Sequence, residues 1–405
     1  MKDGGLRQAA LLGAVLLLVL LPSNVPAGVV PLLQQEWSTS AALMGAVVGA
    51  YQLGYAVAVL VVLPLTDRFS ARRVVLASVV ITLAASLAFA LLARDPVTAI
   101  VLRVIAGAGL AGAYMPGVRI VAAAADPARR GRAVGLYVSA FYLGSSLSLL
   151  FTGILLGPVG WRGAALALAS ATALALVVTL ATPIATERPA GRARLDPSVV
   201  REPRLLGAVV AYAGHTWELY AARGWLAAFF AVVLAARTGS PLEASAVGSQ
   251  WAAGMLALGV LGVSLGGLVS DRAGRHASAA VFALASGVLS IVLGTLGAAP
   301  WPVVVAVGCL LGLLISADSA IYSTLVTETV PAERLGSAQA IQASIGFLAA
   351  SAAPAAAGLA TDVGLGWPGV FATAGAASIL AAVVMAAQIP GRSRPFRRAR
   401  SSAST

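Results

Sequence analysis

The sequence predicts an all-α integral membrane protein with twelve transmembrane helices, arranged as two parallel six-helix repeats around a central cavity. Its composition, its regular apolar runs and the similarity of its two halves support this fold. Of its 405 residues, 59% are hydrophobic and only 10% are charged, and the mean hydropathy is +0.92. A soluble domain usually carries about a quarter charged residues. Lipid is therefore expected to be the main solvent.

Apolar runs follow one another along the whole chain with short polar breaks between them. About 20 such residues cross roughly 30 Å of hydrocarbon. The first run follows Lys2 and Arg7, but it is too long for a signal-peptide core and eleven further runs follow it, so we expect a retained first helix. In order, the helices are predicted at 9–32, 41–65, 74–93, 97–124, 133–157, 162–184, 206–235, 243–269, 277–298, 302–326, 336–360 and 368–389.

The distribution of Lys and Arg predicts the orientation. Alternate loops in one phase hold 21 of the 27 basic residues, and the opposite loops hold only Arg94, Arg162 and Arg237. Cytoplasmic loops keep an excess of Lys and Arg. Both termini are thus expected in the cytoplasm, with the protein in the inner membrane. Because the charge is spread among loops and not gathered on one face, we expect no nucleic-acid partner.

The two halves of the sequence share landmarks at a fixed offset. Asp67-Arg68 follows the second helix and Asp271-Arg272 follows the eighth, 204 residues later. The pairs Pro127-Ala128 and Pro331-Ala332 repeat this offset of 204. Parallel repeats of this kind place a binding site at the midplane between the halves. We therefore predict an N-terminal six-helix half, a cytoplasmic linker, a C-terminal six-helix half and a basic cytoplasmic tail, at 1–184, 185–205, 206–390 and 391–405.

The loop after the eighth helix carries the most specific motif. Residues 267–276 read Gly-Leu-Val-Ser-Asp-Arg-Ala-Gly-Arg-His, and residues 63–73 keep the Asp-Arg pair and two further arginines without the glycines. This pattern resembles the signature loop Gly-x-x-x-Asp-Arg-x-Gly-Arg-Lys/Arg of the major facilitator superfamily. The element Arg103-Val-Ile-Ala-Gly107 is similar to the helix-four motif of that family. The resemblance spans essentially the whole chain and implies a monomeric secondary transporter in the lipid bilayer, without cofactor or metal.

The resemblance also implies a gate. In the family, the Asp of each signature loop caps a helix of the other half, where the positive helix end favours a carboxylate. Asp67 would then face the eleventh helix, and Asp271 the fifth. Such contacts would close the cytoplasmic side and break when it opens; the alternative is that these loops only anchor the topology. The residues of this predicted gate are Asp67, Arg68, Asp126, Asp271, Arg272 and Arg275.

Ionisable residues far from helix ends indicate the mechanism, because a charge in hydrocarbon costs at least about 2.5–3.5 kcal/mol on insertion scales. Glu218 lies near mid-membrane in the predicted helix 206–235, and His215 shares its face three residues earlier. Arg223 lies about 80° around the helix from His215. A carboxylate beside an imidazole suits the uptake and release of protons. The alternative is a static set of pairs that locks helix packing.

Two further buried charges are candidates for substrate or proton coupling. Asp318 lies in a polar stripe of the predicted helix 302–326, and Arg103 matches an arginine that the family links to the central cavity. Each has an alternative role. Asp318 could be a static partner of another residue, and Arg103 could snorkel to the membrane interface. Polar and aromatic residues that would be costly facing lipid could line the cavity: Asn24, Tyr51, Gln52, Tyr55, Tyr114, Tyr137, Tyr142, Gln250, Gln339 and Gln342.

The residues favour transport over enzymatic activity. One cysteine in an apolar run and two histidines do not supply a metal cluster or a nucleophile with its base, and no phosphate-binding Gly-x-x-x-x-Gly-Lys loop is present. Three arginines inside predicted helices, Arg103, Arg119 and Arg223, favour a small organic or inorganic anion moved with protons. A drug/proton antiporter for lipophilic or cationic compounds is the alternative, although residues 142–153 lack the Gly-Pro core of the family's antiporter motif. The direction of transport stays open.

Overall fold

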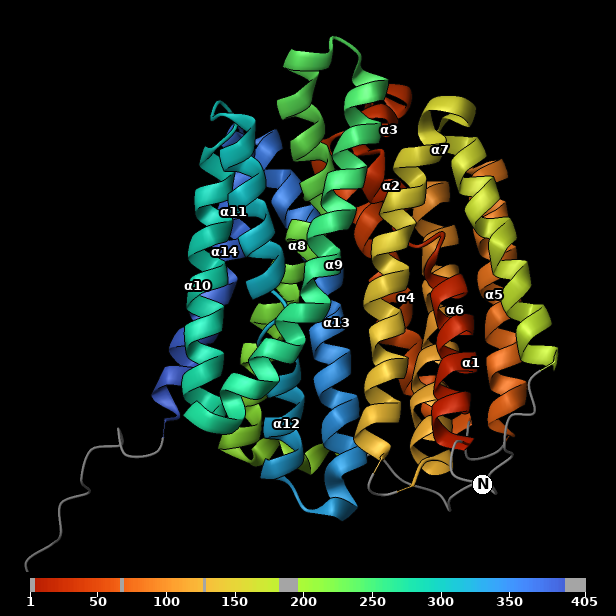
Figure 1. The fold of residues 1–405 in the computed structure, drawn as a ribbon, viewed down its shortest axis with the longest axis vertical. Helices are drawn as coiled ribbons and strands as arrows, with labels where there is room; N and C mark the ends of the chain where they lie inside the picture. Colours follow the sequence, from red (N-terminus) through yellow and green to blue (C-terminus); the bar gives the residue numbers. More distant parts are fainter. Residues whose placement is uncertain (1–3, 66–68, 127–128, 182–195, 390–405) are drawn as a thin grey trace, which may run out of the picture.

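The computed structural model describes residues 4–65, 69–126, 129–181 and 196–389, which form helices and connecting turns and contain no strand (Figure 1). This confirms the predicted all-α fold. The helices, in order, are α1 Gly4–Leu20, α2 Val25–Gly28, α3 Val30–Trp37, α4 Ala41–Leu65, α5 Ala71–Leu92, α6 Pro96–Ala124, α7 Arg130–Ala181, the 3-10 helix η1 Pro197–Arg201, α8 Pro203–Thr238, α9 Pro241–Ala273, α10 Arg275–Thr295, α11 Trp301–Leu314, α12 Ser319–Thr329, α13 Ala332–Asp362 and α14 Gly366–Ala387.

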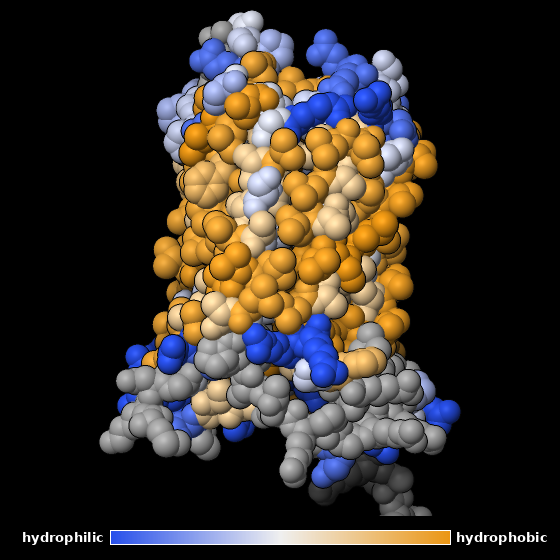
Figure 2. Space-filling view, turned by 90° about the vertical axis from the view of Figure 1, so that its right-hand side faces the viewer, coloured by the Kyte–Doolittle hydropathy of each residue, from blue (hydrophilic) through white to orange (hydrophobic). Residues whose placement is uncertain are grey.

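The described helices contain every predicted membrane crossing. Ten helical segments are long and apolar enough to span a bilayer by length and composition, and α1 is a shorter apolar helix. The 52-residue α7 carries two crossings because it reverses direction at Gly160, whose φ of 65° and ψ of 177° are not helical. Figure 2 shows a broad hydrophobic band between two hydrophilic ends, as expected for a protein whose solvent is lipid.

Two predicted helices are broken, which the apolar pattern did not indicate. The predicted helix 9–32 is divided into α1, α2 and α3, with Pro22 and Asn24 at the first break. Proline lacks a backbone N–H, so the Leu18 carbonyl loses its helical donor and accepts from Thr172 Oγ1 of α7 at 3.1 Å. At the same break the Asn24 N–H donates to Ser148 Oγ at 2.9 Å, and Asn24 Nδ2 donates to the Ser145 carbonyl at 3.0 Å. The predicted helix 302–326 is likewise broken between α11 and α12, at residues 315–318.

Arginines mark one end of the bundle, here called the basic end and defined by Arg72, Arg130, Arg204 and Arg275. The start of α1 also lies at this end, at the bottom of Figure 1. Of the predicted linker 185–205, residues 185–195 lie outside the described part, and the rest forms η1 and the start of α8. Asp196 caps η1, accepting hydrogen bonds from the Ser198 hydroxyl and N–H, which hold the pKa of this carboxyl below its usual value. The predicted tail 391–405 lies outside the described residues.

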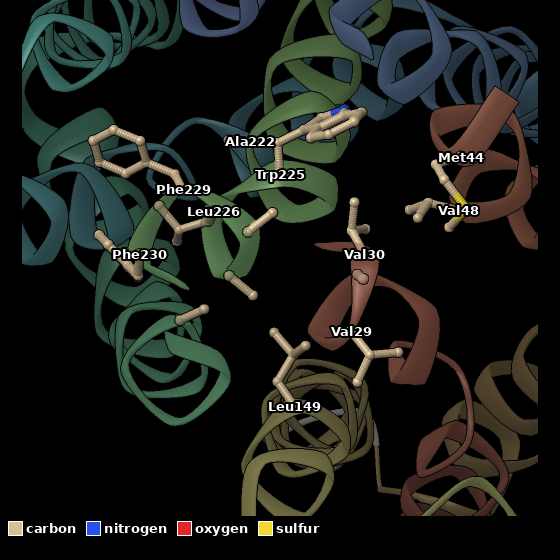
Figure 3. Close-up of a cluster of buried hydrophobic side chains, with 14 of the residues drawn as sticks. Val29, Val30, Met44, Val48, Leu149, Ala222, Trp225, Leu226, Phe229 and Phe230 are labelled. Atoms are coloured by element: carbon tan, nitrogen blue, oxygen red, sulfur yellow. The ribbon is translucent and has the colours of Figure 1, made fainter. Parts of the chain in front are cut away.

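The buried apolar side chains form three clusters, which show where the helices α1–α7 and α8–α14 meet. One cluster lies within α1 and α4–α7 and another within η1 and the helices from α8 on, both toward the basic end. The third crosses between the two sets of helices near the opposite end. Figure 3 shows part of this cluster, with Val29, Val30 and Leu149 near Trp225 and Leu226 of α8. The two halves are thus sealed by apolar contact at the end opposite the basic end.

Backbone contacts reinforce this seal. A Cβ at Gly45 or Gly49 of α4 would collide with the carbonyl oxygens of Pro354 and Ser351 in α13, so glycine allows the two helices to approach closely. At the end of α13 the Asp362 carboxylate accepts hydrogen bonds from the N–H groups of Ala41 at 2.9 Å and Ala42 at 2.8 Å. This carboxylate lies at the positive end of α4, where negative charge is favoured. The end opposite the basic end is therefore closed.

Candidate functional site

A cavity of about 380 Å³ lies between the two halves. It reaches the exposed residues Ser323 and Gln339 toward the basic end, on the side of the molecule where the halves have separate cores. Its size is within the usual range of small-molecule sites, about 300–1,000 Å³. The residues that line it include Tyr55, Tyr114, Phe141, Tyr142, Tyr212, His215, Thr216, Tyr220, Arg223, Ser319, Gln342 and Phe347.

Aromatic rings from both halves form the walls. The ring centroids of Tyr55 in α4 and Phe347 in α13 are 4.2 Å apart, and those of Phe347 and Tyr220 are 5.9 Å apart. On the other side, Tyr114 and Phe141 lie 5.3 Å apart. Rings at these separations are in the range of favourable aromatic pairing. The cavity is thus shaped to hold a ligand with apolar surface.

His215 and Asp318 form the polar centre of the cavity wall. The break between α11 and α12 turns Asp318 toward α8, where its Oδ1 lies 2.8 Å from His215 Nδ1. This contact has the distance of an ion pair but not the alignment of a good hydrogen bond. The other carboxylate oxygen accepts a hydrogen bond from the Tyr322 hydroxyl at 3.0 Å. Asp318 and His215 are each 1% exposed, so water screens their interaction little.

A hydrogen-bond chain connects this pair to the other half of the protein. His215 Nε2 lies 2.7 Å from Ser319 Oγ, and the Tyr142 hydroxyl of α7 donates to the same Ser319 Oγ at 3.3 Å. His215, Ser319 and Tyr142 all line the cavity, whereas Asp318 lies behind His215. A proton or a ligand group in the cavity can therefore reach the pair through His215 or Ser319.

Glu218 is not part of this cluster. It is fully buried and faces α10, where its two carboxylate oxygens accept hydrogen bonds from Ser286 and Ser290, each at 2.8 Å. Ser378 of α14 lies 3.3 Å from Ser286 and donates to the Ala283 carbonyl. Glu218 does not line the cavity, and among the described residues no hydrogen bond or ion pair joins it to His215 or Arg223, although it lies close enough to His215 to interact with it electrostatically. Its contacts instead link α8 to α10 and α14.

Replacing Glu218 with leucine is expected to lower the free energy of unfolding by about 1–3 kcal/mol, because serine hydroxyls lose their acceptors inside the second half. Glu218→Gln keeps an acceptor and the side-chain size, so the loss should be much smaller. Thermal unfolding of the detergent-purified variants measures both. If Glu218→Gln unfolded like the wild type but no longer responded to a pH gradient in uptake, Glu218 would be a proton carrier and this structural assignment would be wrong.

Arg223 lies in the deep part of the cavity. It is 5% exposed, and its guanidinium carbon is 4.9 Å from the centroid of the Tyr220 ring. In the described part of the chain no carboxylate lies within ion-pair distance of Arg223, and its Nε has no hydrogen-bond partner. A buried cation without a counterion is costly. The cavity thus has positive charge available for a ligand.

Arg103 has a different environment. Its Nε donates to the Val47 carbonyl at 2.7 Å, and its Nη2 donates to the carbonyls of Ser23 at 2.9 Å and Val48 at 3.2 Å. These bonds tie α6 to α4 and to the break after α1, and Arg103 does not line the main cavity. Of the two deeply buried membrane arginines, therefore, Arg223 rather than Arg103 faces a ligand space.

The structure divides the predicted cavity residues into three groups. Tyr55, Tyr114, Tyr142, Gln339 and Gln342 line the main cavity. Asn24, Tyr51 and Gln52 line a small adjoining hollow. Gln250 packs against the position of Gly153, and the Tyr137 hydroxyl donates to the Ala113 carbonyl at 3.0 Å.

The predicted gate residues can be followed only in part. Asp67 and Arg68 lie outside the described residues. Asp271 pairs with Arg275 of its own half, and Arg275 also contacts Glu328 at 3.3 Å. Arg272 donates to the Leu268 carbonyl at 3.4 Å, and Asp126 is exposed. The contacts of Asp271 therefore lie within the second half, on the side where the two halves are apart.

Several cavity residues were not predicted: Tyr212, Thr216, Tyr220, Phe141 and Phe347. Helical spacing contained a signal for two of them, because residues 212, 216, 219 and 223 follow the i, i+4, i+7, i+11 pattern of one face. The same spacing turns Glu218 about 120° away from Tyr212. The packing of Phe141 and Phe347 against other helices has no such local signal.

Comparison with known proteins identifies the architecture. The family described as Major Facilitator Superfamily matches residues 12–242 and 219–404. A gallate transporter of Pseudomonas putida is 34% identical over 140 residues, and an uncharacterized transporter, YgaY, of Escherichia coli O157:H7 is 33% identical over 132 residues. These matches cover 34% and 32% of this chain, and they span only 31% and 32% of the relatives' own length.

Solved structures show the same fold. A bacterial homolog to the human lysosomal transporter Spinster, in an inward-facing and occupied conformation, superposes with a TM-score of 0.73 at 18% identity. Its inward-facing and unoccupied conformation gives a TM-score of 0.70 at 17% identity. Each comparison covers 95% of both chains. At this identity the likeness shows the fold alone.

Proposed function

The chain belongs to the Major Facilitator Superfamily and is a secondary transporter, and from this premise we propose that it moves a small organic anion together with protons by alternating access. The observation that carries this proposal is Arg223. A guanidinium that is 5% exposed, faces a ligand cavity and has no carboxylate partner among the described residues is suited to an anionic ligand. An anion would supply the missing counterion.

The pair of His215 and Asp318 is proposed as the proton site. With a neutral imidazole and an ionised carboxylate, the pair carries one negative charge next to the cavity, which disfavours a bound anion. A proton taken up through His215 or Ser319 removes that charge. Anion and proton then favour each other's binding, because their charges interact in a poorly solvated cavity. This electrostatic coupling favours symport over exchange of the anion for a proton.

The direction of opening follows from the proposed orientation. We assign the basic end to the cytoplasm, because cytoplasmic loops keep an excess of Lys and Arg, and the protein to the inner membrane. The cavity then opens inward, and the seal of Val30, Leu149 and Trp225 closes the periplasmic side. In the outward-open state the seal would separate and the basic ends of the two halves would meet.

One relative supports the anion class. The match to the gallate transporter of Pseudomonas putida covers about a third of each protein, and gallate is a carboxylate with an aromatic ring. A specific observation favours the alternative, a drug/proton antiporter: the aromatic walls would also suit a lipophilic cation, with Asp318 as its counterion. Arg223 opposes that reading, because a buried cation repels a cationic ligand.

A thermal-shift panel on the purified transporter separates the two functions. Benzoate, as a representative organic anion, is expected to raise the unfolding temperature, whereas tetraphenylphosphonium, a lipophilic cation, should leave it unchanged. The stabilisation should grow as the pH is lowered, because the proton and the anion bind together. Stabilisation by the cation alone would reject the anion proposal in favour of the antiporter.

A further inference from the structure

We propose that Tyr51, Gln52 and Tyr55 of α4 form, with Arg223 of α8, a subsite for the carboxylate of the substrate. We further infer that the substrate is a monocarboxylate with a flat apolar body, which occupies the aromatic part of the cavity. This inference rests on the proposed anion transport and adds where each part of the anion is held. No comparison assigns a role to these α4 residues.

The subsite is a hollow of about 10 Å³ that adjoins the main cavity. Tyr55, Phe141, Tyr220, Arg223 and Phe347 line both spaces, so the hollow continues the cavity inward. A volume near 10–15 Å³ is about what one water-sized group needs. The hollow can therefore take one oxygen of a carboxylate, with the other at its border with the main cavity, but not a whole substrate.

Buried polar atoms without hydrogen-bond partners gather at this hollow. Among the described residues they include Tyr51 Oη, Tyr55 Oη, Gln52 Oε1 and Arg223 Nε. Tyr51 is 2% exposed and Tyr55 is fully buried. Buried polar groups are nearly always paired, so a group of unpaired ones indicates a ligand or water that completes them. The Tyr220 hydroxyl interacts with both Gln52 and Arg223, which shows that these two side chains converge.

The chemistry of these groups fits a carboxylate. Two tyrosine hydroxyls and a guanidinium are able to donate hydrogen bonds, and a carboxylate accepts several such bonds with its two oxygens. The unpaired Gln52 Oε1 is an acceptor, so Gln52 would border the carboxylate without donating to it through that atom. Arg223 is the one cation at this hollow among the described residues, so a single negative charge is balanced and a dianion such as sulfate is not. Arg103 does not line this hollow, and three of its five donors are bonded to backbone carbonyls.

The aromatic walls of the main cavity fit the part of the substrate beyond its carboxylate. Tyr220, Phe347 and Phe141 border the hollow on the cavity side, so a body attached to the carboxylate would lie among their rings. A flat ring can pack face to edge between such walls, whereas a puckered one of the same size fits less well. Residues from both halves hold the same carboxylate in this arrangement, so binding ties α4 to α8. That link provides a physical basis for substrate-dependent closure.

Isothermal titration of the full-length purified transporter tests the subsite with simple probes. Benzoate is expected to bind at least about tenfold more tightly than acetate, benzyl alcohol or sulfate, and more tightly than cyclohexanecarboxylate. Tyr51→Phe and Tyr55→Phe should each weaken benzoate about tenfold, because each removes one hydrogen bond to a charged group. Tyr137→Phe is the matched control: its hydroxyl bonds to backbone carbonyls away from the hollow, so benzoate affinity should not change.

The outcomes separate this inference from the proposed function. If wild-type protein binds acetate and sulfate as tightly as benzoate, or if both tyrosine variants bind benzoate like the wild type, the subsite is wrong while anion transport stands. If no anion binds to the wild type, the proposed function fails, and the subsite with it. Phenylalanine keeps the ring of each tyrosine, and the unfolding temperature without ligand confirms that each variant is folded.

Discussion

Arg223→Gln is expected to weaken the binding of an organic anion by about 100-fold or more, because a buried charge pair with the ligand is worth about 2–5 kcal/mol. Glutamine keeps hydrogen-bonding capacity and much of the side-chain length, so the loss reports the charge. Titration with benzoate measures the affinity. Arg162→Gln is the control: Arg162 pairs with Glu36 at 2.9 Å at the end opposite the basic end, with both side chains well exposed, and should have no effect on binding.

The thermal stability of Arg223→Gln without ligand distinguishes a ligand-binding arginine from a structural one. Arg223 has no counterion in the described part of the chain, so its removal should leave the protein without ligand equally stable or more stable. A structural arginine behaves in the opposite way. Arg103→Gln should make the protein without ligand less stable, because three buried backbone carbonyls would lose the hydrogen bonds that Arg103 donates to them. A less stable Arg223→Gln with wild-type anion affinity would contradict the role proposed for Arg223.

Asp318→Asn is expected to abolish uptake against a concentration gradient while leaving exchange of the anion intact. An electroneutral symporter of one proton and one monoanion concentrates its substrate about tenfold for each pH unit, since one unit is worth about 1.36 kcal/mol. Without a carboxylate beside His215, that ratio should fall to about one. Asparagine retains an acceptor for the Tyr322 hydroxyl, so the fold should survive.

Two assays on proteoliposomes separate these effects. Accumulation is measured with an acidic exterior, and counterflow of labelled anion is measured without a pH gradient. Glu218→Gln is the matched control, because it alters a buried carboxylate on the same helix that does not line the cavity. If Asp318→Asn accumulated the anion like the wild type, the proton site would have to be elsewhere.

Much of the architecture was predictable because crossing a bilayer imposes length and hydropathy on each helix. Each predicted segment overlaps one or more described helices, with differences at the ends and at the two breaks, and the reversal at Gly160 lies where one polar break was expected. The helix breaks at Asn24 and before Asp318 were not predictable. The apolar runs continue through both breaks, and each break is stabilised by partners in other helices. Hydropathy records burial in lipid or protein alike, so it does not locate such breaks.

The sequence indicated which residues belong to the site better than it indicated which of them contact one another. His215, Arg223 and Asp318 were selected because buried charges are costly, and the structure brings all three to or beside the cavity. Spacing along α8 suggested that His215 would meet Glu218, but its partner is Asp318, which is 103 residues away in sequence. Helical periodicity orders side chains around one helix and contains no information on which helix packs against it.

Uptake of a labelled anion by proteoliposomes tests the central claim, symport of a proton and an organic anion, most directly. With wild-type protein, labelled gallate, whose three hydroxyls slow the unaided passage of its neutral acid through lipid, should accumulate about tenfold inside the vesicles when the exterior is one pH unit more acidic, while protein-free vesicles should not accumulate it over the same time. Gallate should not accumulate with a sodium gradient at equal pH, or with Arg223→Gln. Accumulation driven by sodium alone, or gallate uptake that does not respond to the pH gradient or does not exceed that of protein-free vesicles, would contradict the account.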